Sequence, residues 1–124
     1  MNKHLSIPKP YSELLDQLFE IERKIENIKE TNSISRNINN MKSIFENINS
    51  SATESNVGLI YHNPIGEPYN ETRLDLEASI AGESTEDLII KEVIKPIIRY
   101  KQGESTFIVR KGVVIVESKN RGVK

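Results

Sequence analysis

The sequence contains no cysteine, so it has no disulfide framework, no thiol nucleophile and no sulfur-ligated metal site. Aromatic residues make up only 6% of the chain and apolar residues 36%, which is less than most globular proteins contain. Isoleucine nevertheless recurs along the whole chain, so we expect an ordered protein with small hydrophobic cores. In a chain of 124 residues, a small core often means that a second chain supplies the missing burial.

Long apolar runs and runs of like charge are also missing. No stretch approaches the length of a membrane span, and the start "MNKHLSIPKPY" lacks the apolar centre of a signal peptide. The net charge of −1 gives no general attraction to nucleic acid. These absences favour a soluble, cytoplasmic protein with no membrane and no nucleic-acid partner.

Residues that carry chemistry are few and scattered. The histidines, His4 and His62, are too far apart in sequence to suggest a metal or catalytic site. Glu83, Glu86 and Asp87 cluster in a turn-like segment, but their spacing does not resemble a calcium loop. Glycine-rich phosphate loops and the G-x-S-x-G motif are absent. We therefore expect no enzymatic activity, no metal and no cofactor.

The first half of the chain has a helical period. Its apolar residues form two series, each with steps of 4, 3, 4 and 3 residues: Leu14, Leu18, Ile21, Ile25 and Ile28, then Ile34, Ile38, Met41, Phe45 and Ile48. A step of six residues separates the series, and the intervening "ETNSIS" is rich in residues that favour turns and caps. The pattern predicts an antiparallel helix hairpin over residues 12–49; a single bent helix is the alternative.

The N-terminal boundary of this hairpin is predicted from proline and serine. Pro8 and Pro10 disfavour helix, and Ser12 is suited to a helix start, so residues 1–11 are expected to be extended. Leu15 and Phe19 widen the first apolar stripe, as in a helix with several packing neighbours.

A helix hairpin with an apolar stripe on each helix needs a partner to cover it. Helices of this length are marginal alone, so a second copy could complete a dimeric four-helix bundle. The two series of apolar residues are then the dimer interface. The alternative is that the stripes pack on the C-terminal half of the same chain.

After a small polar linker, residues 50–56, the period changes to that of strands. "VGLIYH", "LEASIA", "DLIIKEVIKPIIRY", "STFIVRK" and "GVVIVES" are rich in β-branched residues and are separated by turn signals. Pro96 lies inside the longest run, so that strand is expected to be at a sheet edge or bulged. The fold class is thus α+β, with a mainly antiparallel β domain over residues 57–119 and a basic tail over residues 120–124.

Charge is uneven within this β half. Acids dominate from Glu67 to Glu92, and bases dominate from Lys95 to Lys124. Neighbouring strands could pair these charges across the sheet, or the basic segment could meet an acidic partner.

Together, these motifs resemble the GrpE family, the nucleotide exchange factors of DnaK-type heat-shock chaperones. The β domain of that family opens with Pro-x-Gly-x-x-Phe-Asp, and "PIGEPYNE" supplies Pro64, Gly66, Tyr69 and Asn70. "LLDQLFEIER" is similar to the first short bundle helix, Arg99-Tyr100 to a later Gly-Tyr, and "VRKGVVIV" to the last strand. The family's His-Glu-Ala is replaced by "LDL", its closing alanine by Gly112, and its long N-terminal stalk helix has no counterpart.

The resemblance implies a homodimer that binds the nucleotide-binding domain of a DnaK-type chaperone and promotes ADP release. Residues carried over as chaperone contacts are Arg23, Tyr69, Glu71, Pro96 and Val116. Because the chain departs from the family pattern, the alternative is a non-catalytic dimeric adaptor that kept the scaffold but lost exchange activity.

Overall fold

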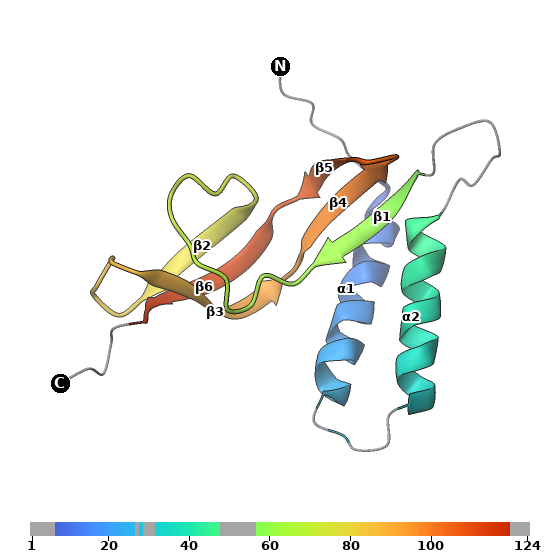
Figure 1. The fold of residues 1–124 in the computed structure, drawn as a ribbon, viewed down its shortest axis with the longest axis horizontal. Coiled ribbons are helices and arrows are strands. Elements are labelled where there is room, and N and C mark those ends of the chain that lie inside the picture. Colours follow the sequence, from blue (N-terminus) through green and yellow to red (C-terminus); the bar gives the residue numbers. More distant parts are fainter. Residues whose placement is uncertain (1–6, 27, 29–31, 48–56, 120–124) are drawn as a thin grey trace. The chain divides into compact units, whose positions relative to one another are not determined.

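In the computed structural model the protein is α+β, and the residues that the structure describes form two helices and six strands in two small sheets (Figure 1). The structure describes residues 7–26, 28, 32–47 and 57–119. The predicted linker and basic tail, and Ile48 of the predicted interface, lie outside these residues. The folded chain divides into two compact units. We call residues Met1–Tyr61 and Ile98–Val109 the helix–sheet unit, and His62–Ile97 and Arg110–Lys124 the mixed-sheet unit.

The two predicted helices are present, with boundaries that differ from the prediction. Helix α1 spans Lys9–Ile25 and α2 spans Asn32–Glu46, side by side in Figure 1. The expectation that the prolines keep residues up to 11 extended is wrong, because Pro10 lies in the first turn of α1. The first N–H groups of a helix have no partner within it, so proline is tolerated there. Ser12 is not the cap; its hydroxyl donates to the carbonyl of Lys9 at 3.0 Å.

The helices pack on a three-stranded sheet of their own chain. This sheet has the order β1-β4-β5, with β1 at Val57–His62, β4 at Ile97–Gln102 and β5 at Ser105–Arg110. Its core is Leu15 from α1, Leu59 from β1 and Ile98 from β4, all at most 2% exposed. Phe19 stacks edge-to-face on Tyr61 with 5.9 Å between ring centroids. The expected separation of a helix hairpin from one β domain is therefore wrong, since the strands of this sheet belong with the helices.

Some residues of the predicted dimer interface are buried within the single chain. Leu18 is 2% exposed and Ile38 is 4% exposed, so both belong to the core of the chain and not to its surface. Phe45 packs against the same core. For Phe45, which packs against Leu59 and Ile98, the alternative of packing on the C-terminal half is what the structure contains.

The second sheet has the order β2-β6-β3 and mixed strand directions. Its strands are β2, Leu76–Ala81; β3, Leu88–Lys95; and β6, Gly112–Ser118. Strand β6 is central, parallel to β2 and antiparallel to β3. The register places Ala78 beside Val114 and Ile80 beside Val116, so these side chains share one face.

The prediction for Pro96 is confirmed in one respect and wrong in another. Strand β3, which ends just before Pro96, is an edge strand with shifts of register, the last between Val93 and Lys95. The long run from Asp87 to Tyr100 is two strands that belong to different sheets, β3 and β4, and Pro96 separates them. Proline has no N–H to donate to a neighbouring strand, so pairing ends there. The chain changes sheets again at Lys111, between β5 and β6. Arg110 donates a hydrogen bond to the carbonyl of Pro96 at 2.7 Å and ties the two crossings together.

Candidate functional site

The segment from Asn63 to Asp75, which we call the Arg73 loop, is a built structure at the edge of the mixed sheet. Gly66 has a φ of 82°, which glycine adopts without strain. Its N–H donates to the carbonyl of Ile90 at 2.8 Å, and the N–H of Ile90 donates to the carbonyl of Glu67 at 2.9 Å. The N–H of Tyr69 donates to the carbonyl of Leu88 at 2.9 Å. The loop thus covers the outer edge of β3 and fixes the backbone of Tyr69.

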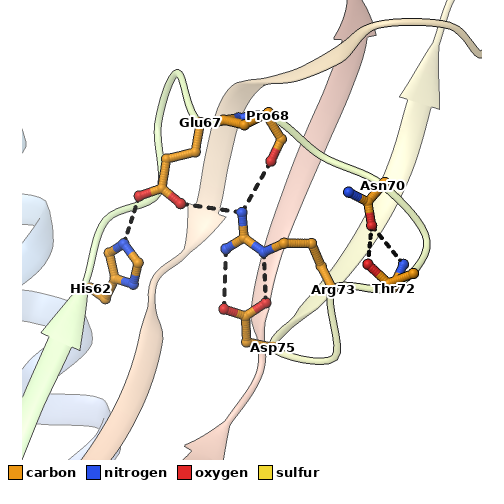
Figure 2. A network of polar contacts seen from close by, with 7 residues as sticks. All are labelled: His62, Glu67, Pro68, Asn70, Thr72, Arg73 and Asp75. Carbon is orange, nitrogen blue, oxygen red and sulfur yellow. Dashed lines mark hydrogen bonds and ion pairs between the residues drawn. The ribbon is translucent and has the colours of Figure 1, made fainter.

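Arg73 holds this loop together by binding across it (Figure 2). Its guanidinium donates to both carboxylate oxygens of Asp75, at 3.0 and 3.1 Å. It also donates to the carboxylate of Glu67 at 3.2 Å and to the carbonyl of Pro68 at 3.1 Å. The hydrogen bond to Asp75 is the main cause that raises the pKa of Arg73, and Glu67 adds to it. A planar guanidinium can bridge two carboxylates in this way, which a lysine could not reproduce.

Further contacts hold Glu67 and the turn at Asn70–Thr72 within the loop. His62 lies 2.7 Å from the carboxylate of Glu67, so Glu67 is bound from both sides (Figure 2). Asn70 accepts hydrogen bonds on its side-chain oxygen from the N–H of Thr72, at 2.8 Å, and from the Thr72 hydroxyl. This turn holds Glu71 at its tip, where the side chain is exposed.

The loop forms one wall of an open groove of about 750 Å³. Tyr69 and Glu71 line it from the loop, and Ile80 lines it from β2. Asp87 and Lys119 complete its charged rim. Ile80 is 46% exposed, so the groove has an apolar wall that the described residues leave open. Because its lining combines apolar and charged side chains, the groove is suited to binding the surface of another molecule.

Within the described part of the chain, no cluster of three or more histidine, aspartate or glutamate side chains is arranged to hold a metal ion. Over the same residues, no helix has the length and apolar character needed to cross a membrane.

The predicted contact residues fall into three groups. Tyr69 and Glu71 lie together at the groove. Pro96 and Val116 are fully buried, so their expected role as surface contacts is wrong; they pack the core. Val116 is on the central strand of its sheet, between β2 and β3, and is 0% exposed.

Arg23 lies on α1, in the helix–sheet unit. It forms a 2.8 Å ion pair with Glu20 and its guanidinium lies 5.1 Å from the ring centroid of buried Phe19. Its side chain is 42% exposed, which leaves surface for an additional contact.

A separate apolar surface lies on the two helices. Of the predicted interface residues, those that remain exposed are Leu14, Ile21, Ile28, Ile34 and Met41, with exposures between 42% and 54%. Ile25 is half-buried. The seven-residue spacing of Leu14 and Ile21, and of Ile34 and Met41, places each pair on one helix face. Tyr11 and Ile44, which the series did not include, are exposed as well.

Sequence reasoning missed the residues that organise the groove. In the sequence, "LDL" is a departure from the family pattern; in the structure, Asp75 within it binds Arg73 and Leu76 begins β2. The R-x-D spacing was the available signal, but ion pairs at that spacing are common on surfaces. Gly112 was another such departure. A Cβ there would lie 2.9 Å from Ile97, so the neighbouring side chains leave little room for alanine.

No protein-family model matches this sequence, and neither a curated protein nor a solved structure matches it significantly.

Proposed function

We propose that the chain is a homodimeric, cytoplasmic co-chaperone that promotes ADP release from a DnaK-type chaperone. The observation that carries this proposal is the rigidly held Arg73 loop, which presents Tyr69 and Glu71 at the rim of an open groove. Those residues are two of the contacts that the resemblance to the GrpE family implies. Arg23, half-exposed on α1, is the third available contact.

The physical mechanism requires no chemistry by the chain. A protein that binds the open form of a nucleotide-binding domain more tightly than the closed form shifts the population toward the open form. Nucleotide then leaves faster, and by reciprocity bound ADP weakens the binding of the exchange factor. A half-buried tyrosine and an exposed carboxylate on a fixed loop are suited to such a contact, because little conformational entropy is lost on binding.

Dimerisation is supported by the apolar stripe that remains on the outer face of the hairpin. Exposed apolar patches of this kind are typical of protein interfaces. A second copy of the hairpin would bury Leu14 and Ile21 of α1 and Ile34 and Met41 of α2 in a four-helix bundle. Replacing Ile21 with Asp should therefore convert a dimer to a folded monomer, since Ile21 is 43% exposed in the single chain. Light scattering at micromolar concentration measures this, with Ile65→Asp, 50% exposed in the other unit, as the control.

One observation favours the second candidate, a dimeric adaptor without exchange activity. Pro96 and Val116, two of the carried-over contacts, are inaccessible to any partner. Fewer contacts would then be left to hold the nucleotide-binding domain of the chaperone open. An adaptor needs only to bind its partner and does not have to open it.

The decisive experiment measures release of fluorescent ADP from DnaK-type chaperones encoded in the same genome. We expect acceleration by the natural chain and at least a tenfold loss with Tyr69→Ala or Glu71→Lys, about 1.4 kcal/mol of binding. Glu104→Lys, an exposed charge reversal in the other unit, is the control. If no chaperone responds but a pull-down recovers a different protein through the same residues, the adaptor replaces the exchange factor.

A further inference from the structure

Strand β2 is the open edge of the mixed sheet. The strand order β2-β6-β3 gives the sheet two edges, and the Arg73 loop covers the β3 edge through backbone hydrogen bonds. Among the residues that the structure describes, no strand pairs with the other side of β2 (Figure 1). An unpaired edge presents backbone donors and acceptors to another extended chain.

The two sides of β2 have different chemistry. Ala78 and Ile80 share the face that lines the groove, and Ile80 is 46% exposed there. Glu77 and Ser79 alternate with them, so they point to the opposite face and are exposed. A strand added beside β2 would therefore place one set of side chains next to Ile80 and the other set next to Glu77.

Carboxylates dominate the surface around this edge. Glu71 and Asp87 line the groove, and Lys119 is the one base among those of its lining residues that the structure describes. Glu83 and Glu86, both exposed, belong to the turn that joins β2 to β3. A second copy of the chain would bring its own Glu77 and the same carboxylates to the contact, so self-pairing is disfavoured by like charge.

We propose that β2 and the adjoining groove bind an extended peptide segment that alternates apolar and basic residues, by addition of a strand to the sheet. Backbone hydrogen bonds to β2 supply affinity, and the two side-chain sets supply specificity. The apolar set enters the groove against Ile80 and Tyr69, and the basic set lies on the opposite face of the sheet, beside Glu77. The partner is thus a protein segment with a basic strand-like or disordered stretch. This proposal stands apart from nucleotide exchange, because it rests on the β2 edge and is tested without a chaperone.

The probe is a fluorescent hexapeptide that alternates lysine with isoleucine, matched to the six residues of β2. Fluorescence anisotropy with the full chain should give saturable binding with a Kd below about 1 mM. The same peptide with alternate backbone nitrogens methylated keeps its charge but cannot pair as a strand, and it should bind at least about tenfold more weakly. A peptide with glutamate in place of lysine should also bind more weakly.

Ile80→Lys should weaken binding of the lysine–isoleucine peptide by at least about tenfold. Ile94→Lys is the matched control, because Ile94 is 45% exposed on β3 of the same unit and does not line the groove. Glu77→Lys is a second variant, on an exposed position that leaves the core intact. Circular dichroism establishes that each variant is folded.

Three results would overturn the proposal: no saturable binding, equal binding of the methylated peptide, or equal losses with Ile80→Lys and Ile94→Lys. A change of oligomeric state with Ile80→Lys, without peptide binding by the natural chain, would assign the edge to self-pairing and also overturn it. These measurements involve no nucleotide, so a negative result would overturn peptide binding at β2 without deciding whether the chain promotes ADP release.

Discussion

Arg73→Ala tests whether the loop at the groove is held by a partly buried ionic network or by solvated charges. The side chains of Arg73 and Asp75 are 20% and 15% exposed, so both are largely withdrawn from water. The substitution removes four hydrogen bonds, two of them to Asp75, and leaves that carboxylate without the guanidinium. Exposed ion pairs contribute about 0–1 kcal/mol, and breaking a buried pair costs about 3–5 kcal/mol. We expect a loss of about 2 kcal/mol in the free energy of unfolding of the mixed-sheet unit.

Amide hydrogen exchange is the appropriate assay, because it reports each unit separately. A loss of about 2 kcal/mol should accelerate exchange about 30-fold at protected amides of β3 and β6, including Ile90, whose N–H binds the loop carbonyl of Glu67. Amides of β4, in the other sheet, should change less. Arg73→Lys should recover part of the loss, since lysine keeps the charge but not the paired geometry.

Arg23→Ala is the matched control. Arg23 also binds one carboxylate with two hydrogen bonds, at 2.8 and 2.9 Å, but the two side chains are 42% and 34% exposed. Its removal should cost about 1 kcal/mol, including the contact with the Phe19 ring, and should leave exchange in β6 unchanged. Equal effects of the two substitutions on their own units, or a loss below about 0.5 kcal/mol for Arg73→Ala, would refute the reasoning.

The remaining predictions concern the helix–sheet unit and the sheet cores. Burial, together with a hydrogen bond to Glu22 at 2.6 Å, raises the pKa of Tyr61. Above about pH 10 the Tyr61 hydroxyl loses its proton in the unfolded chain but keeps it in the folded chain, so urea midpoints should fall as the pH rises. Tyr61→Phe should reduce that fall. An unchanged pH dependence of the urea midpoint in Tyr61→Phe would contradict this prediction. A Cβ on Gly58 would overlap the backbone of Glu46, so Gly58→Ala should destabilise by about 3 kcal/mol or more in urea unfolding. In Gly112→Ala the new Cβ would lie 2.9 Å from the side chain of Ile97, which can shift, so we expect a loss of about 1–2 kcal/mol in the free energy of unfolding. A larger loss for Gly112→Ala than for Gly58→Ala would contradict this reasoning.

Much of the secondary structure was predictable because it is local. The 4, 3, 4, 3 spacing predicted both helices, and three strand segments, at residues 57–62, 76–81 and 112–118, coincide with β1, β2 and β6. Helix ends were predicted less well, since a first-turn proline such as Pro10 is compatible with helix and the residues from Asn32 onward join α2.

The candidate site was predictable only in part. The resemblance carried by "PIGEPYNE" implied contacts at Tyr69 and Glu71, and both residues lie at the groove. Ile80 and Asp87 could not be assigned to it, because their place depends on the pairing of β2 and β3 with β6. Val116 is buried for the same reason, because its strand β6 lies between β2 and β3. The periodicity of one strand does not specify which neighbours that strand will pair with.

The sequence by itself determined which segments are helices and strands, because period and turn residues act over a few neighbours. The tertiary structure decided which sheet each strand joins, and so which apolar residues stay exposed. Leu18 and Leu14 belong to the same periodic series, yet Leu18 is 2% exposed and Leu14 is 54% exposed. The helices pack on β1, β4 and β5 by one side only, and an apolar series cannot specify which of its members that packing will cover.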